Sequence, residues 1–299
     1  MQVYFKLLGA AIFWGGTFIA GRIVSREMDP YSAAFIRFLI ASVFLLAAIR
    51  IRQGYLPTLK KKQIIPVVLL GMTGIFAYNI LFFKGLHTVH AGRASLIIAL
   101  NPIFISLSSS IFFKERLTIF RGAGILISFL GAAIVITYGN VGNIINMPIS
   151  SGDFFIFGCV VSWTAYSLIG KVVMTGLSPL VSVGYSSTIG ALALLIPATL
   201  NGVFSQMPVI SLIEWSSLFY LGFFGTVLGF FWYYDAISRI GPMKASVFIN
   251  FVPVSAILLA FLILDEPVTW SLISGALLVI SGVLLTNFSE QLWRMLKKL

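Results

Sequence analysis

The chain has 299 residues, of which 59% are hydrophobic and 10% are charged, and its mean hydropathy is +1.02. Soluble domains carry about 25% charged residues, so this composition excludes an ordinary water-soluble globular protein. Apolar runs of about 20 residues, long enough to cross a hydrocarbon core of about 30 Å, recur along the whole sequence and predict an all-α integral membrane protein. The formal charge of +11 is spread over short clusters between these runs, with no DNA-reading motif, so we expect no nucleic-acid partner.

Ten apolar stretches are predicted to be transmembrane helices. In chain order they cover roughly residues 4–24, 31–50, 64–84, 92–113, 119–138, 153–173, 180–200, 213–234, 243–264 and 270–288. The first stretch lacks a convincing small-residue cleavage site, so we interpret it as a retained helix rather than a signal peptide. An uncharged linker at 140–152 is expected outside the membrane between the first five helices and the last five.

The distribution of basic residues predicts the orientation. If the N-terminus lies in the cytoplasm, the cytoplasmic segments contain fifteen Lys and Arg residues and the outer segments contain four. The positive-inside rule therefore predicts that both termini are cytoplasmic. The tail at 289–299 is basic and amphipathic, which is typical of a segment that lies on a membrane surface.

One segment of the chain occurs twice. Residues 91–118 and 242–269 match at an offset of 151 positions, in the pairs Ala94/Ala245, Ser95/Ser246, Pro102/Pro253, Glu115/Glu266 and Thr118/Thr269. The same offset relates Gly71/Gly222, Gly124/Gly275 and Gly131/Gly282, and an offset of 149 relates Trp14/Trp163 and Pro30/Pro179. Such self-similarity indicates that about half of the chain has been duplicated.

The two copies, residues 1–139 and 153–288, each contribute five predicted helices. Because five is odd, the second copy must enter the membrane from the opposite side, so the copies are predicted to be inverted. Inverted repeats are the construction of many secondary transporters, whose two halves move about a site near the bilayer midplane. A membrane-embedded enzyme or a scaffold has no particular need of this symmetry.

These features resemble the EamA-type members of the drug/metabolite transporter superfamily. The likeness is carried by the series Pro102–Glu115–Gly124–Gly131 and Pro253–Glu266–Gly275–Gly282, with Trp14 and Arg37 in addition. It covers essentially the whole chain. It implies a basket of ten helices, built as two inverted five-helix repeats around a central cavity lined mainly by helices 1, 3, 4, 6, 8 and 9. It also implies export of amino acids or other small metabolites across a bacterial inner membrane.

Two tryptophans related by the repeat are the first candidates for substrate binding. Trp14 shares a face of the first helix with Thr17, Phe18 and Gly21, and Trp163 shares a face of the sixth with Tyr166. Large rings beside hydroxyl groups and small residues suit a pocket for a small amphipathic substrate. For both tryptophans, packing or contact with lipid is the alternative.

Asn101 and Asn250 lie beside Pro102 and Pro253 in the fourth and ninth predicted helices. Proline leaves a backbone carbonyl without its helical hydrogen bond, and inside a membrane that carbonyl needs another donor. These amides could donate to the freed carbonyls, or they could bind substrate beside them. Interhelical hydrogen bonding is the alternative. Further candidates for the cavity lining are Tyr78 above all, and Asn79, Phe82, Trp232 and Tyr233.

Charged residues are candidates for gating or structural roles. Arg37 lies about two turns into the second helix, where a buried charge costs about 2.5–3.5 kcal/mol, so it is expected to face the interior and to support the structure. Holding a substrate carboxylate is the alternative. Glu115 and Glu266 close the two repeats, where helix-end or gate contacts are expected. For Glu115 we expect local pairing with Lys114 and Arg116.

No carboxylate lies near the centre of a predicted helix, although proton-driven transporters commonly use one. Asp235, near the inner end of the eighth helix, is the candidate for proton coupling. The alternatives are coupling through the substrate, coupling through His87 and His90, or none. Two histidines are a weak metal motif and no Walker-type loop is present, so we expect neither a metal nor another cofactor.

Small residues are expected to serve packing. The pairs Gly124/Gly131 and Gly275/Gly282 are seven residues apart, so each pair lies on one face of its helix and permits close contact with a neighbour. The single cysteine, Cys159, lies in an apolar run and cannot form an intramolecular disulfide. We expect it to be a packed core residue.

The sequence predicts a secondary transporter, not an enzyme, that exports a small organic metabolite by alternating access. Amino acids, including aromatic and hydrophobic ones, are the preferred substrates because the candidate lining is rich in rings and poor in charge. An uncoupled facilitator of other metabolites or drugs is the alternative. A membrane-embedded lipid-handling enzyme is disfavoured, because the sequence offers no cluster of His, Asp or Glu for it. The expected partners are the substrate and the lipid bilayer, with the chain a monomer or a weak homodimer.

Overall fold

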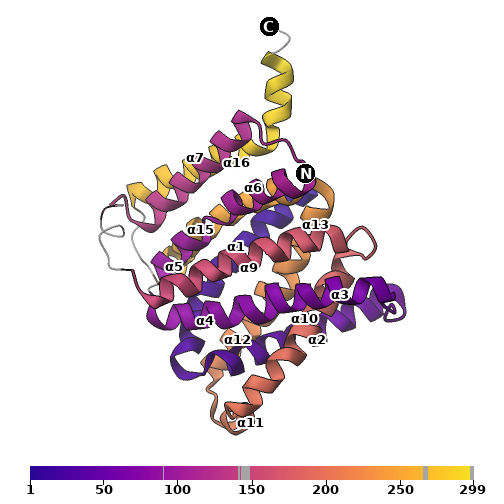
Figure 1. Ribbon diagram of the computed structural model, residues 1–299. Coiled ribbons are helices and arrows are strands. Elements are labelled where there is room, and N and C mark those ends of the chain that lie inside the picture. Colours follow the sequence, from indigo (N-terminus) through magenta and orange to yellow (C-terminus); the bar gives the residue numbers. More distant parts are fainter. Residues whose placement is uncertain (90, 141, 143–148, 265–268, 297–299) are drawn as a thin grey trace.

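The computed structural model describes residues 1–89, 91–140, 142, 149–264 and 269–296, and over these ranges it is a bundle of helices without a strand (Figure 1). Nine helices in the described part are long and apolar enough to cross a membrane: Gln2–Glu27, Pro30–Gln53, Lys61–Thr88, Arg93–Phe113, Ile119–Ile136, Ser151–Val173, Pro179–Leu200, Leu212–Ile240 and Trp270–Ser289. They coincide with nine of the ten predicted helices. The prediction of an all-α, multi-pass membrane protein is therefore confirmed.

The first half of the chain forms a run of seven α-helices and one π-helical segment. These are α1 (Gln2–Glu27), α2 (Pro30–Gln53), α3 (Lys61–Leu70), the π segment η1 (Gly71–Ala77), α4 (Tyr78–Thr88), α5 (Ala91–Ile98), α6 (Asn101–Phe113) and α7 (Ile119–Ile136). The start of α2 follows from its local sequence. The Asp29 side chain accepts hydrogen bonds from the amides of Tyr31 and Ser32, and Pro30 occupies the first helical turn, where its missing N–H costs nothing.

The second half is built from α-helices of 4 to 27 residues, with 3₁₀ and π-helical segments between some of them. They are α9 (Ser151–Val173), α10 (Pro179–Leu200), α11 (Val203–Gln206), the 3₁₀ segment η2 (Met207–Val209), α12 (Leu212–Tyr220), the π segment η3 (Leu221–Leu228), α13 (Gly229–Ile240), α14 (Pro242–Ser246), the 3₁₀ segment η4 (Val247–Asn250), α15 (Phe251–Leu264) and α16 (Trp270–Leu296). Several boundaries differ from those expected; for example, the span Leu212–Ile240 ends six residues after the expected end at 234. The helix α9 begins at Ser151 rather than residue 153, and α16 continues to Leu296 through most of the expected tail.

The ninth expected helix, residues 243–264, is not one continuous α-helix. It consists of α14, η4 and α15 in succession, and the fourth expected helix is likewise broken, between α5 and α6. Both breaks lie directly before a proline, Pro253 or Pro102. A proline inside a helix removes a donor and its ring clashes with the carbonyl four residues earlier, which belongs here to Ile249 or Ile98.

Two π-helical segments also stand at related positions. The segment η1 begins at Gly71 and η3 contains Gly222, which lies 151 positions later. Short π-helical segments widen a helix locally and frequently occur at functional sites. Here η1 packs against α10 and η3 packs against α2 and α1, so each widened turn contacts a helix of the other half.

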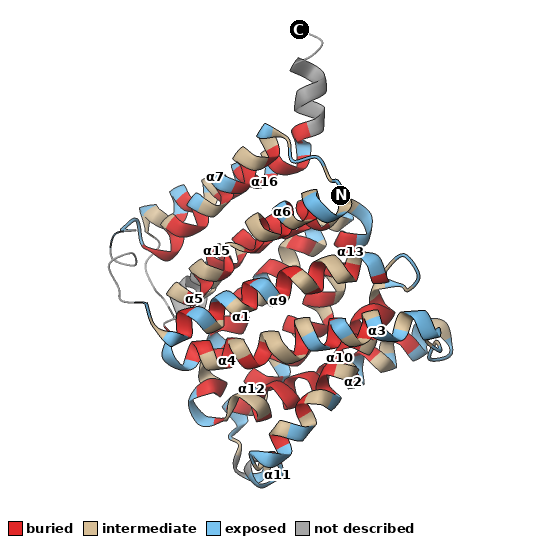
Figure 2. Ribbon diagram, in the orientation of Figure 1, coloured by how far each residue is buried: buried red, intermediate tan, exposed pale blue. Residues whose placement is uncertain are grey.

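The two halves interlock throughout the bundle. Helix α7 packs on α16, α2 on α10, α4 on α9, and α1 on both α13 and α15; the pairing of α7 with α16 is plain in Figure 1. Each pair joins a helix of the first half to one of the second. In Figure 2 the buried residues lie mostly where helices face one another, while apolar side chains such as Ile65, Ile111 and Leu200 are exposed on the outside, as a lipid-facing surface requires.

Helices α7 and α16 approach each other through glycines. A methyl group added to Gly131 would lie 2.6 Å from the carbonyl oxygen of Gly275, and one added to Gly124 would lie 2.7 Å from the carbonyl oxygen of Gly282. No side chain fits at such distances. The expectation that these four glycines permit close helix contact is confirmed.

Candidate functional site

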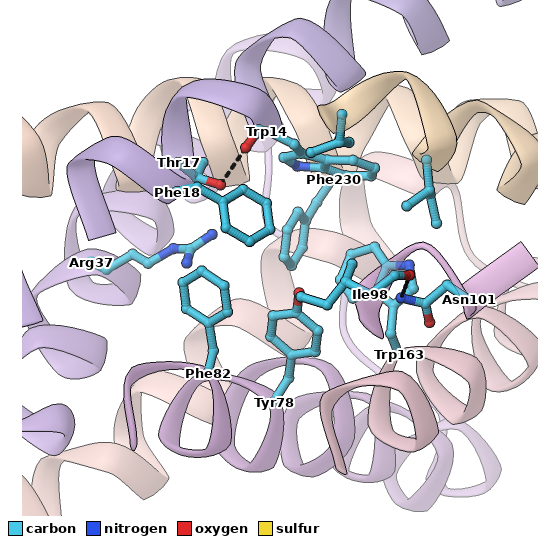
Figure 3. A pocket seen from close by; sticks show the side chains of 12 residues that line it. Trp14, Thr17, Phe18, Arg37, Tyr78, Phe82, Ile98, Asn101, Trp163 and Phe230 are labelled. Carbon is cyan, nitrogen blue, oxygen red and sulfur yellow. Dashed lines mark hydrogen bonds between the residues drawn. The ribbon is translucent and has the colours of Figure 1, made fainter. Parts of the chain in front are cut away.

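A cavity lies where α1, α4, α9 and α13 meet (Figure 3). It is lined by Trp14, Thr17, Phe18, Arg37, Tyr78, Phe82, Ile98, Asn101, Trp163, Phe230, Ile249 and Val252. Its free space is about 40 Å³, which is room for a few water molecules but is too small for an amino acid. In this conformation the cavity is therefore closed around its own side chains.

The two tryptophans related by the repeat contact each other in this cavity. The rings of Trp14 and Trp163 meet edge to face, with centroids 5.5 Å apart. Trp163 also packs against Phe230 and Tyr78, with centroid distances of 4.9 and 5.4 Å. The indole Nε1 of Trp14 donates a hydrogen bond of 2.9 Å to the carbonyl of Gly225 in η3. Rings from both halves thus form one continuous wall.

Arg37 is held between the two π-helical segments. Its Nε donates to Thr226 Oγ1 at 3.2 Å, and its Nη1 donates to Asn79 Oδ1 at 3.0 Å. Thr226 lies in η3 and donates in turn to the carbonyl of Leu221, five residues earlier, at 3.1 Å. Asn79 follows η1 and donates to the carbonyl of Ile75 at 2.8 Å. The guanidinium therefore connects one half of the protein to the other.

The same arginine contributes a positive charge to the cavity. Its side chain is 3% exposed, and among the described residues no carboxylate lies within 4.0 Å of it. None of the other lining residues is charged. We expected Arg37 to face the interior and support the structure. It does so, and it also lines the cavity, so the supporting role and the substrate-binding alternative remain compatible.

Asn101 hydrogen-bonds to a carbonyl that is left without its helical partner at the break in its own helix. Its Nδ2 donates to the carbonyl of Ile98 at 2.9 Å, which is the carbonyl that Pro102 prevents from bonding in the helix. Its Oδ1 is buried and meets no donor among the described residues. Asn101 therefore has the first of the two roles considered for it, and it retains a free acceptor in the lining.

Two of the proposed binding residues lie outside the cavity lining. Tyr166 is fully buried behind Trp163, with ring centroids 5.2 Å apart, and its hydroxyl lies 3.4 Å from Ser186 Oγ. The amide of Asn250 lies 2.8 Å from Ser128 Oγ and so connects η4 to α7. These positions correct the expectation: Tyr166 supports the wall, and Asn250 makes the interhelical hydrogen bond that was its alternative role.

Asp235 lies near the end of α13, away from the cavity. Its Oδ2 accepts a hydrogen bond from Lys6 Nζ at 2.7 Å, and its Oδ1 accepts one from Arg239 Nε at 2.9 Å. Lys6 belongs to the first turns of α1. This acid therefore forms part of an ion-pair cluster that connects the two halves at one end of the bundle.

Glu115 also pairs across the halves. Its Oε1 contacts Lys171 Nζ, in the last turn of α9, so the expected local pairing with Lys114 and Arg116 is wrong. Lys114 has a left-handed backbone conformation, with φ of 53°, which ends α6 and turns the chain towards α9. Glu266, the equivalent residue of the second repeat, lies outside the described residues.

The lining contains residues that the sequence analysis did not single out, namely Ile98, Phe230, Ile249 and Val252. A signal existed for two of them. Ile98 and Ile249 are 151 positions apart, and each stands four residues before a repeated proline. Phe230 had no such signal, because aromatic residues make up 14% of the chain and their mutual contacts arise only on folding.

The remaining reactive side chains show no metal-binding geometry. The described residues contain no group of three His, Cys, Asp or Glu side chains that could hold a metal ion. His87 is exposed, and His90 lies outside the described residues. Cys159 is buried as expected, with its Sγ 3.4 Å from the carbonyl oxygen of Tyr78.

Comparisons with known proteins cover nearly the whole chain. Residues 1–137 and 150–288 match the EamA-like transporter family. The uncharacterized transporter YyaM of Bacillus subtilis is 32% identical over 284 residues, which are 95% of this chain and 93% of that protein. A probable terminal-alkyne amino-acid exporter of Streptantibioticus cattleyicolor is 30% identical over 295 residues, 96% and 93% of the two chains. A solved crystal structure shares the fold, with a TM-score of 0.76 at 20% identity, over 96% of this chain and 97% of that one.

Proposed function

The chain belongs to the EamA-like transporter family, and on this premise we propose that it exports small organic metabolites by alternating access. Amino acids with aromatic or apolar side chains are the preferred substrates. The main support is the central cavity, whose aromatic wall comes from both halves and whose free space of about 40 Å³ admits no substrate unless the halves move. The relative named for export of an amino acid supports both the direction and the substrate class.

The proposed architecture is ten transmembrane helices in two inverted repeats, residues 1–139 and 153–288, with residues 242–264 as the ninth crossing in chain order. The contact between Tyr4 and Phe288, with ring centroids 6.2 Å apart, supports an even number of crossings because it joins the two ends of the chain. The π segments and proline breaks, repeated at the same offset, support the duplication. By the positive-inside rule, both termini lie in the cytoplasm of a bacterial cell, below its inner membrane.

Ion pairs between the halves are proposed to hold the two ends of the cavity closed. Lys6–Asp235 and Glu115–Lys171 lie at one end of the bundle, and Arg93 pairs with Asp153 at 2.6 Å at the opposite end of α9. Each pair joins a residue of the first half to one of the second. Opening towards one side separates the pairs at that side and leaves those at the other side intact, which is the requirement of alternating access.

Coupling to a proton gradient is proposed to depend on Asp235, the acid of the cytoplasmic ion-pair cluster. A protonated Asp235 would release Lys6 and Arg239 and so favour opening at that end. A facilitator without coupling is the second candidate, because the described lining of the cavity contains no acid. In either case the protein works with its substrate and the lipid bilayer as partners, as a monomer or a weak homodimer.

Counterflow in proteoliposomes tests the proposal. Purified protein is reconstituted, the vesicles are loaded with one amino acid, and entry of the same labelled compound is followed with and without an imposed pH gradient, against protein-free vesicles. We expect saturable flux of aromatic or apolar amino acids, recovered chemically unchanged. Flux that follows the gradient supports the coupled exporter, and flux indifferent to it supports the facilitator. Absence of flux for every amino acid tested would overturn the substrate class.

A further inference from the structure

The guanidinium of Arg37 enters the cavity, and no carboxylate of the described residues forms an ion pair with it. Its Nε and Nη1 donate to neutral oxygens of Thr226 and Asn79, and its Nη2 donates to no group in the described part of the chain. The residue is 3% exposed. A buried charge that lacks an opposite charge is unfavourable unless a ligand supplies one, and a guanidinium with free N–H groups matches the geometry of a carboxylate.

The cavity presents a second unused polar atom opposite this cation. In Figure 3, Arg37 reaches the cavity from one side and Asn101 from the other, with the rings of Phe18, Phe82 and Tyr78 between them. The Oδ1 of Asn101 is buried and has no donor among the described residues. It is an acceptor, so it suits a neutral donor such as a hydroxyl or amide N–H at the far end of a ligand.

We infer that Arg37 binds the carboxylate of the substrate, and that the site prefers compounds of net charge −1 over zwitterions of the same shape. This inference rests on the proposed transport function and changes its preferred substrates from zwitterionic amino acids to aromatic or apolar monoanions. The described lining offers one cation and no anion, so an α-ammonium group would find only neutral acceptors and ring faces. Aromatic or apolar monocarboxylates, and amino acids whose amine is acylated, neutralise Arg37 and place their apolar part among the rings.

Three ligands with the same phenyl ring but different charge test the inference. Binding of 3-phenylpropanoate, L-phenylalanine and L-phenylalaninamide is measured by calorimetry on the full chain in nanodiscs of neutral lipid, near pH 6, where their net charges are −1, 0 and +1. We expect affinity to fall in that order. Because a hydrogen bond to a charged group is worth more than a neutral one, loss of the carboxylate should weaken binding about tenfold or more. Empty nanodiscs correct for partition into lipid.

Variants of Arg37 separate its charge from its shape. Arg37→Gln should remove the preference for the anion, and Arg37→Lys should keep the order of affinities with weaker binding, because lysine lacks the two-pronged geometry. The matched control is Arg50→Gln on the same helix α2. Arg50 is exposed and lies outside the cavity, so all three affinities should stay unchanged.

Two results would overturn the inference: L-phenylalanine binding as tightly as 3-phenylpropanoate, or Arg37→Gln leaving the affinity for 3-phenylpropanoate unchanged. If Arg37→Gln fails to fold, the order of the three binding affinities of the unmodified protein still tests the inference. Counterflow of amino acids without any preference for anions would reject the inference and leave the proposed transport function standing. No binding and no flux of any of these compounds would reject both.

Discussion

The indole rings of Trp14 and Trp163 meet edge to face, with centroids 5.5 Å apart and an angle of 89° between their planes. The two residues are 149 positions apart in the chain and lie on α1 and α9, one in each half. Trp14 is also fixed to η3 by its hydrogen bond to Gly225. If the halves separate as proposed, this contact between the two rings has to change.

Replacement of Trp163 by alanine should reduce counterflow at least about tenfold. The substitution removes the ring that contacts Trp14, Tyr78 and Phe230 and leaves a void in the cavity wall. Trp163→Phe keeps a ring and should retain part of the flux. The control is Trp270→Ala, whose side chain is 85% exposed. Near-normal flux of a well-folded Trp163→Ala protein would remove Trp163 from the substrate site.

Thr226→Val should lower the thermal unfolding midpoint of the protein in detergent. The change conserves shape but deprives Arg37 Nε of its acceptor in a buried site, and an unsatisfied buried partner costs about 1–3 kcal/mol. Thr226→Ser, which keeps the hydroxyl, should have a thermal unfolding midpoint close to that of the unmodified protein. Thr199→Val is the matched control, because Thr199 is exposed and its hydroxyl bonds only to its own helix. Equal midpoints for Thr226→Val and Thr199→Val would show that the Arg37 contact does not stabilise the fold.

Reversal of either charge in the Glu115–Lys171 pair should slow counterflow, and reversal of both should restore much of it. Each single reversal, Glu115→Lys or Lys171→Glu, places two like charges at the contact between the end of α6 and α9, which disfavours closure at that end. The effect should shrink in high salt, because the side chains are 21% and 30% exposed and so are partly screened. Lys61→Glu, at an exposed position of α3, controls for the change in net charge that Lys171→Glu makes. Normal rates for both single variants would exclude a gating role for this pair.

Gly131→Ala should destabilise the protein, whereas Gly122→Ala should not, although both glycines lie on α7. A methyl group on Gly131 would be 2.6 Å from the carbonyl oxygen of Gly275, whereas one on Gly122 would meet no atom within 4 Å. Overpacking typically costs about 1–3 kcal/mol, and alanine in an open helical position gains about 0.5–1 kcal/mol over glycine. The thermal unfolding midpoints of the two variants are measured in the same detergent and compared. A Gly131→Ala protein as stable as Gly122→Ala would mean that α7 and α16 separate at little cost.

Much of the fold could be predicted from the chain because the bilayer leaves few choices. Each crossing needs an apolar run of about 20 residues with all backbone groups bonded internally, and nine such helices lie where they were expected. The break in the helix within residues 242–264 could not be predicted from composition. Composition marks that stretch as apolar throughout, and the interruption before Pro253 becomes apparent only in the backbone path.

The candidate site was predicted in part. The repeat identified Trp14 and Trp163 as partners, because a duplicated pair in an interlocked bundle comes together at the shared interface. Helical periodicity also placed Tyr166 on the same face as Trp163, but periodicity does not say which neighbour covers that face, and Tyr166 is behind the cavity wall. Glu115 finds its partner in Lys171, 56 positions away, which no local charge pattern indicates.

Composition and the repeated motifs were sufficient to predict the membrane, nine of the helices and the family, because each of these depends on local hydrophobicity or on residues at fixed spacing. The identity of the cavity wall, the neutral hydrogen-bond partners of Arg37 and the partners of Asn101, Glu115 and Asp235 could be found only in the folded bundle. Those features depend on which side chains meet from distant segments, such as Arg37 with Thr226, 189 positions apart. Contacts of that kind follow from how helices pack, and packing is set by the shapes of all the neighbours together.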